Sequence, residues 1–342
     1  MTPMLNPFGN GFDLVDLTTA INKIPNMYGL TNELNLFAPE PVITNQVVVE
    51  ELAGTLNLLP VLPVGSPGTV SQADKRKMRG FIIGSIPHDD VVLPQEVQGV
   101  RAFGTGNATE TIAAIMARKL ARMRNKHAIT LEYLRMGALK GVIENSNGST
   151  IYDLYAEFGI QKKIIDCALN NAGTDVLGKT LEMKAWIEDH LFGETMRSIL
   201  VLCSASFFRA LTSHANVTKA FTYYMANNQN LAGDYRLGFN FGGSADSPVL
   251  FREYRGRASD PSGELRYFLP DKGAIAFPLG TIDTFRTFFA PADFTETANT
   301  PGLELYAKQV ERKFNRGWDL HTQSNPLPIC KRPELLVTLT TP

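Results

Sequence analysis

The most regular hydrophobic pattern of the chain lies between residues 107 and 140. Apolar side chains recur there every three or four positions, and most of the basic residues fall between them. The pattern predicts one amphipathic helix of about 34 residues and about 50 Å, which begins at an Asn-x-x-Glu capping sequence. The core face of this spine helix is expected to hold Ile112, Met116, Leu120, Met123, Leu131 and Leu134.

The pattern before the spine helix is interrupted by prolines and predicts extended segments. Residues 1–45 are expected to form an arm, because their short apolar groups cannot fold alone and need a body or a neighbouring chain to cover them. Residues 46–86 predict a long hairpin, in which two apolar strands flank an irregular tip with a basic stretch. Such a hairpin is marginally stable by itself and needs a partner surface.

The pattern after the spine helix predicts further strands and helices. Residues 141–158 read as a β-hairpin around an Asn- and Gly-containing turn. Residues 178–315 mix strands and helices in the proportion of an α/β domain. The segment 316–342 ends in an apolar strand, 334–340, which we expect to pair within the sheet of its own subunit, since an exposed apolar edge invites aggregation. With the helix and hairpin placed in a domain of residues 87–177, the fold class is α+β.

Composition narrows the function classes. The 33 Lys and Arg residues nearly balance the 34 Asp and Glu residues, which argues against a dedicated nucleic-acid binder. At 44% hydrophobic and 20% charged residues, the chain can bury a sizeable core and is not disordered by composition. No apolar run is long enough to span a membrane, and the first residues lack the pattern of a secretion signal, so we expect synthesis in the cytosol.

The search for reactive groups predicts no catalytic residue, no cofactor and no metal site. The three cysteines are far apart and are expected to be buried free thiols. His88, Asp89 and Asp90 form the densest ligand-like cluster, but they lie between prolines and favour a polar turn. His127 is expected to be a packing histidine on the spine helix. An enzyme would require a pocket in which the scattered acids and histidines converge.

The order of these parts resembles the major capsid proteins of lambda-type tailed phages, the capsid protein E family, which have the Hong Kong 97-type fold. Four stretches carry the resemblance in chain order: IPHDDVVLPQEVQGVRAFG before the spine helix, RMGALKGVI after it, YFLPDKG, and QSNPLPICKRPELLVTL near residue 340. Each motif alone is weak, but the ordered set covers nearly the whole chain.

The resemblance implies an N-terminal arm (1–45), an E-loop (46–86), a P-domain built on the spine helix (87–177), an A-domain (178–315) and a segment that returns to the body (316–342). It implies a non-enzymatic virion protein, made in the host cytoplasm, whose copies form hexamers and pentamers of an icosahedral head around double-stranded DNA. Portal and scaffolding proteins are implied partners, often with a decoration protein. A nanocompartment shell of the same fold that encloses a protein cargo is the alternative.

The arms and the E-loop supply the candidate contacts between subunits. These candidates are Phe12, Leu36, Phe37, Lys75, Arg76, Lys77, Arg79 and Phe81.

Overall fold

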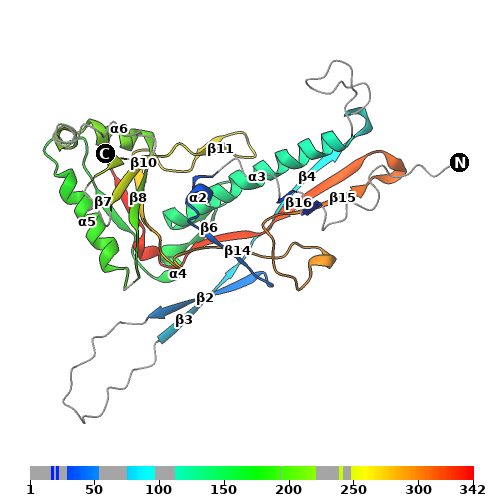
Figure 1. The fold of residues 1–342 in the computed structure, drawn as a ribbon, viewed down its shortest axis with the longest axis horizontal. Coiled ribbons are helices and arrows are strands. Elements are labelled where there is room, and N and C mark those ends of the chain that lie inside the picture. The colour runs from blue at the N-terminus through cyan, green and yellow to red at the C-terminus, as the bar shows by residue number, and fades with distance from the viewer. Residues whose placement is uncertain are drawn as a thin grey trace, which may run out of the picture. The chain divides into compact units, whose positions relative to one another are not determined.

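The structure is a computed structural model, shown in Figure 1, that describes residues 17–18, 21–22, 29–53, 75–96, 112–192, 194–220, 239–241 and 248–342. The chain divides into two compact units. Unit 1 comprises Met1–Val47, Phe81–Tyr133 and Thr287–Pro328, and unit 2 comprises Val48–Gly80, Leu134–Arg286 and Ile329–Pro342. Each unit combines helices with sheets, which makes the chain an α+β protein.

Unit 2 is built on a six-stranded mixed sheet. Its strand order is β7 (Lys163–Asp166), β18 (Val337–Thr340), β13 (Gly273–Leu279), β8 (Ser198–Cys203), β10 (Val249–Glu253) and β9 (Phe239–Asn240). Strand β8 is the apolar run SILVLC and is buried at every position, because both faces of the sheet are covered.

The terminal strand pairs inside this sheet, as the sequence predicts. Strand β18 lies between β13, to which it is antiparallel, and β7, to which it is parallel. The strand is shorter than the predicted 334–340, since Pro333–Leu335 form the 3-10 turn η5. Proline suits the first position of such a turn because its missing N–H has no partner to lose there.

Helices α5 (Val176–Asp189) and α6 (Ala205–Ser213) cover one face of the six-stranded sheet (Figure 1). The side chain of Asp175 accepts a hydrogen bond from the Gly178 N–H at 2.9 Å and caps α5. Ser204 caps α6 in the same way, accepting from the Phe207 N–H at 3.3 Å. Both caps satisfy backbone donors that a helix start leaves unpaired.

The predicted hairpin of residues 141–158 is shorter than expected. Strands β5 (Val142–Glu144) and β6 (Thr150–Asp153) pair around a turn with Gly148 at φ 83°. Residues Leu154–Phe158 then form helix α4 rather than a strand. The carboxylate of Asp153 starts this helix by accepting from the N–H groups of Tyr155 and Ala156.

Unit 1 is built on the first part of the spine helix and a three-stranded antiparallel sheet. The helix is α3 (Ile112–Lys140), and the strand order is β15 (Tyr306–Glu311), β16 (Trp318–Ser324) and β4 (Ile86–Val92). Apolar side chains of all four elements form one core. Leu17 and Ile21, from the predicted arm, are 1% and 0% exposed in that core, so the chain's own body covers this part of the arm.

The compact units do not follow the predicted boundary at residue 315. Unit 2 ends its long segment at Arg286, and residues 287–315 belong to unit 1. The reason is long-range pairing: β15 adds to β16, so this stretch follows the sheet that faces the spine helix.

The remaining elements are a second three-stranded sheet, two hairpins, a short helix and three 3-10 turns. They are the sheet β1 (Ala38–Pro41), β14 (Phe285–Phe289), β17 (Pro326–Cys330); the hairpins β2 (Gln46–Ala53) with β3 (Lys75–Ile82) and β11 (Arg257–Ser259) with β12 (Leu265–Tyr267); helix α2 (Leu30–Glu33); and 3-10 turns η1 (Pro94–Glu96), η3 (Thr295–Thr297) and η4 (Lys313–Asn315). Within the described ranges, no helix is both long and apolar enough to span a membrane.

Candidate functional site

The residues predicted for the core of the spine helix lie on its buried side. Met116, Leu120, Met123, Leu131 and Leu134 are buried, and Ile112 is partly buried. Arg118, between them in sequence, is exposed. Because α3 passes through both units, Leu134 is in unit 2 and the other five residues are in unit 1.

The residues predicted to contact other subunits are placed differently from one another. The rings of Phe37 and Phe81 are 5% and 1% exposed, so the chain's own core already covers them, and Leu36 is half-buried. Arg79 donates from Nε to the carbonyl of Glu157 at 2.7 Å, and its guanidinium lies 4.5 Å from the centre of the Phe158 ring. Phe12 and the side chains of Lys75, Arg76 and Lys77 lie outside the described residues.

The three-stranded sheet of unit 1 brings together polar residues that are far apart in sequence. The segment His88-Asp89-Asp90 lies within strand β4, not in the polar turn that its prolines suggested. In the register of β4 and β16, Asp89 faces His321 and His88 faces Thr322. Since side chains alternate along a strand, His88 and Thr322 point toward α3, and Asp89 and His321 point to the opposite face.

The face toward α3 holds a buried histidine network. Thr322 donates from Oγ1 to the His88 carbonyl at 3.0 Å, so its oxygen must accept from Nε2 of His127, also at 3.0 Å. This assigns the Nε2–H tautomer to His127. Lys126 contacts Nε2 of His88 at 3.1 Å, and an ammonium can only donate, so this nitrogen is unprotonated.

Both histidines are held neutral by their surroundings. Burial, and to a smaller extent the charges of His88, His321, Arg124 and Lys126, together lower the pKa of His127 to about 4. Burial and Lys126 lower the pKa of His88, against the opposing effect of Asp90 and Asp89. His127 is therefore a packing histidine, as expected from the sequence, and its role is structural.

A small cavity of about 10 Å³ lies beside this network, lined by His127, Arg124 and Ser324 among others. The acceptor Nδ1 of His127 and the donor Nε of Arg124 are buried without a hydrogen-bond partner among the described residues. The volume is close to that of a single water molecule.

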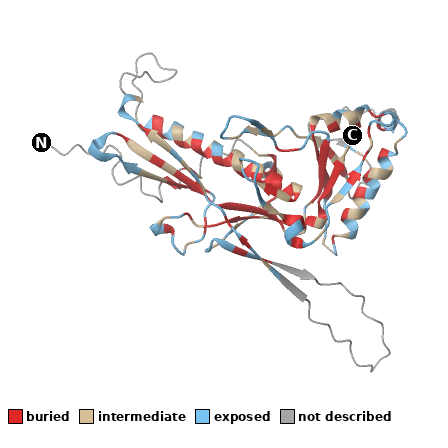
Figure 2. Ribbon diagram, turned by 180° about the vertical axis from the view of Figure 1, so that it is seen from behind, coloured by how far each residue is buried: buried red, intermediate tan, exposed pale blue. Residues whose placement is uncertain are grey.

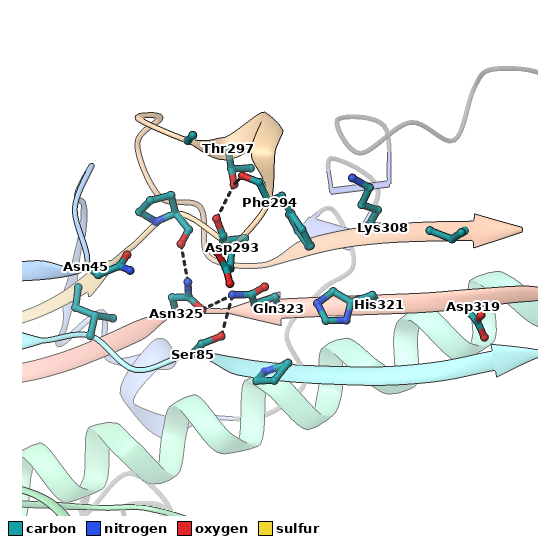
Figure 3. A pocket seen from close by; sticks show the side chains of 16 residues that line it. Asn45, Ser85, Asp293, Phe294, Thr297, Lys308, Asp319, His321, Gln323 and Asn325 are labelled. Carbon is teal, nitrogen blue, oxygen red and sulfur yellow. Dashed lines mark hydrogen bonds between the residues drawn. The ribbon is translucent and has the colours of Figure 1, made fainter.

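The opposite face of the sheet carries an open pocket of about 750 Å³, shown in Figure 3. Its floor is formed by alternate residues of the three strands, and one wall is the loop of residues 291–298. Gln323 in the floor donates from Nε2 to Ser85 at 2.8 Å and to Asn325 at 3.1 Å. Asn325 in turn donates to the Pro291 carbonyl at 2.6 Å, which fixes the wall to the floor.

The charged groups of the pocket are mostly paired. Lys308 forms an ion pair with Glu296 at 2.7 Å, and Asp319 accepts from Nε of Arg312 at 2.7 Å. His321 contacts Asp89 through Nδ1 and packs edge-on against Phe294, with ring centres 5.6 Å apart. The pocket size is in the range of ligand sites.

The thiols of the chain are poorly suited to act as nucleophiles. All three cysteines are buried, and burial raises the pKa of Cys167 to about 12 and raises those of Cys203 and Cys330, so the thiols stay protonated. Among the described residues, no three His, Cys, Asp or Glu side chains lie close enough to hold a metal ion.

Sequence reasoning missed the pocket. The local signal for these two strands is weak, since WDLHTQS alternates only over its first four residues and IPHDDVV has three consecutive polar residues at its centre. The pairing of these two strands could not be read from the alternation alone.

Comparison with known proteins identifies the family. Residues 13–341 match the family model of phage major capsid protein E. The chain is 33% identical to the major capsid protein of Pseudomonas phage KPP10, over 96% of both chains, and 30% identical to that of Salmonella phage Felix O1, over 95% of both. A prophage protein of E. coli CFT073, described as a capsid protein, shares the fold with a TM-score of 0.59 at 15% identity, over 96% of this chain and 99% of that one. The chain therefore belongs to the phage major capsid protein E family and is a structural protein of the phage capsid.

Proposed function

We propose that copies of this chain assemble as hexamers and pentamers into an icosahedral head that encloses double-stranded DNA. The observation that carries the proposal is the β2–β3 hairpin. Val48, Met78 and Ile82 on its two strands are 58%, 65% and 61% exposed. A two-stranded hairpin with this much exposed apolar surface gains stability only when another surface covers it, and a shell of identical copies supplies that surface.

Within this proposal the parts of the chain keep the roles that the family resemblance implies. The hairpin of residues 46–86 acts as the E-loop, the α3 helix with the sheet β15–β16–β4 acts as the body of the P-domain, and the six-stranded sheet forms the core of the A-domain. The near-zero net charge supports close packing, because it avoids repulsion between many copies. Leu36 and Arg79 remain candidate contacts between subunits.

The proposal also includes partners. Portal and scaffolding proteins guide assembly, a decoration protein binds the outside where one is present, and the packaged DNA is held without sequence specificity.

The test is expression of the chain, alone and with its scaffolding protein, followed by sedimentation and electron microscopy. We expect capsomers, sheets or closed shells, and DNA as the content of heads made in infected cells. A stable monomer under every condition would contradict the proposal, and a dense protein core instead of DNA would favour a cargo-enclosing compartment.

A second measurement tests the hairpin itself. Trypsin should cut free subunits within residues 75–79, where basic residues are clustered, and the same cuts should slow several-fold in assembled particles. Equal cleavage rates before and after assembly would show that the hairpin is not covered by a neighbouring copy.

A further inference from the structure

The turn that joins β15 to β16 presents an exposed aromatic ring. Phe314 is 88% exposed, the highest exposure among the large apolar residues that the structure describes. Its backbone is in the left-handed region at φ 64°, which a bulky residue rarely adopts. The guanidinium of Arg316 lies 5.7 Å from the ring centre. The turn therefore holds a ring and a cation together in solvent, at the cost of backbone strain.

The pocket on the same sheet has walls of complementary chemistry. Pro87, Pro291, Phe294 and Val310 supply apolar surface, and Val310 is 59% exposed. Asp293 lies beside them with an exposed side chain (Figure 3). No donor among the described residues reaches its carboxylate, whereas the Asp319 carboxylate is paired with Arg312. The pocket thus offers an apolar wall for a ring and one unpaired acid for a cation.

We propose that this pocket receives the Phe314–Arg316 turn of a neighbouring copy of the chain. In this contact the ring of Phe314 lies against the apolar wall, and Arg316 faces Asp293. The contact rests on the proposed assembly of copies into a shell and names one of the surfaces that would join them. Aromatic residues and arginine are the side chains that most often anchor protein interfaces.

The turn cannot fill the pocket of its own chain. Strands β15 and β16 stay paired up to Glu311 and Trp318, so the turn continues beyond the end of the sheet. Bringing Phe314 back over the pocket would break the last pairs of the hairpin. Each copy therefore carries one projecting turn and one pocket, which makes the contact heterologous. Contacts of this kind close into a ring when the rotation between copies allows it.

A disulfide trap tests the contact directly. The double variant F314C/A298C places one cysteine on the turn and one at the exposed rim of the pocket. The three native cysteines are buried and do not interfere. After mild oxidation of assembled shells, we expect most of the chain to move into dimers and larger species on a non-reducing gel, and to return to monomer on reduction. The matched control F314C/S262C, whose second cysteine lies on the exposed β11–β12 turn of unit 2, should stay monomeric.

A charge exchange tests the same contact without new cysteines. R316D and D293R should each lower the yield of shells at least about tenfold, because each places like charges against one another. The double variant R316D/D293R should recover the yield to within about twofold of the unmodified chain, since the pair is restored in reverse. Thermal unfolding of the free subunits should be the same for all three variants, because neither side chain forms an ion pair that stabilises the fold.

The results of these experiments test the pocket contact and the proposed assembly separately. Shells of normal size that show no trapped oligomers would overturn the pocket contact and leave the proposed function intact, and so would single charge variants that assemble at full yield. Trapping that is equally complete in dilute free subunits would also overturn it. Failure of the unmodified chain to assemble under any condition would overturn the proposed function, and the contact with it.

Discussion

The six-stranded sheet of unit 2 and the three-stranded sheet of unit 1 use their faces differently. Strands β8 and β13 are buried at nearly every position, whereas β4 alternates between half-buried and exposed residues. Figure 2 shows red concentrated in the central strands of the first sheet and mixed colours in the second. A sheet that is covered on both faces carries mainly apolar side chains. A sheet that is covered on one face can carry polar side chains for recognition on the other face.

The difference also separates two kinds of stabilisation. In unit 2, burial of aliphatic side chains is the main source of stability, at roughly 25 cal/mol for each Å² of apolar surface removed from water. In unit 1, part of the sheet is held by side-chain hydrogen bonds such as those of Thr322 and Gln323. These bonds fix the strand register with little gain in stability, and they leave the pocket open. The following changes test this contrast.

The largest effect is expected from Val337→Asp. Val337 is fully buried between β13 and β7, and an unpaired buried carboxylate costs several kcal/mol, about as much as the whole stability of a domain. We expect loss of soluble protein, measured as soluble yield of the full chain. The matched control is Ile164→Asp on the edge strand β7, where the side chain is 56% exposed. If both variants fold alike, the sheet is not the core of unit 2.

A smaller effect is expected from Leu120→Ala in unit 1. Leu120 is 6% exposed in the core between α3 and the sheet β15–β16–β4. Loss of its side chain should lower the free energy of unfolding by about 2–5 kcal/mol. Urea unfolding of free subunits measures the change, and Arg118→Ala on the exposed face of α3 should stay within about 0.5 kcal/mol of the original. The opposite ranking of the two variants would reverse the assigned faces of the helix.

The histidine network should make unit 1 sensitive to acid. His127 has a folded pKa of about 4, below its value of about 6.5 in an unfolded chain. Between these values the unfolded chain binds a proton that the folded chain does not. Stability from this group is therefore complete above pH 6.5 and decreases as the pH falls toward 4, by about 3 kcal/mol in total.

Urea unfolding of free subunits between pH 4 and pH 7 tests this decrease. The variant His127→Leu should lose part of the slope in this window, although it also removes the donor to Thr322 and is less stable at pH 7. An unchanged slope would mean that His127 binds its proton equally in the folded and the unfolded chain.

The smallest effect is expected from a polar change in unit 2. Ser204→Ala removes the cap of helix α6 and should cost about 1 kcal/mol. Ser204→Thr keeps the hydroxyl and should cost less. Both are measured as shifts of the unfolding midpoint. A cost as large as that of Val337→Asp would show that this hydrogen bond matters as much in unit 2 as aliphatic packing does.

Local periodicity carries the parts of the fold that the sequence predicts well. The stripe of Met116, Leu120 and Met123 repeats over many turns, so it indicates a helix and its buried face without knowledge of the partner. The apolar strand near residue 340 could also be predicted from the sequence. Its place inside the sheet follows because an exposed apolar strand would aggregate. In contrast, α4 was missed because the capping carboxylate of Asp153 outweighs the strand-like alternation that precedes it.

The pocket could not be predicted because it depends on pairing between distant segments. Asp89 and His321 meet only through the register of β4 and β16, and no local pattern states that register. The same pairing brings residues 287–315 into unit 1, so the compact units do not follow the boundary at 315 that local patterns suggest. The exposed ring of Phe314 was likewise invisible, since a single phenylalanine in a basic stretch has no periodic signature.

The long separation of β4 and β16 has a consequence during synthesis. Asp89 and His321 are 232 positions apart. At ~5–20 residues per second, β4 leaves the ribosome on the order of 10–50 s before its partner strand exists. An unpaired strand is a template for other nascent chains unless charge or proline blocks it. Pro87, His88, Asp89 and Asp90 place such a block in the middle of β4, so the residues that later join the sheet also keep the waiting strand from aggregating.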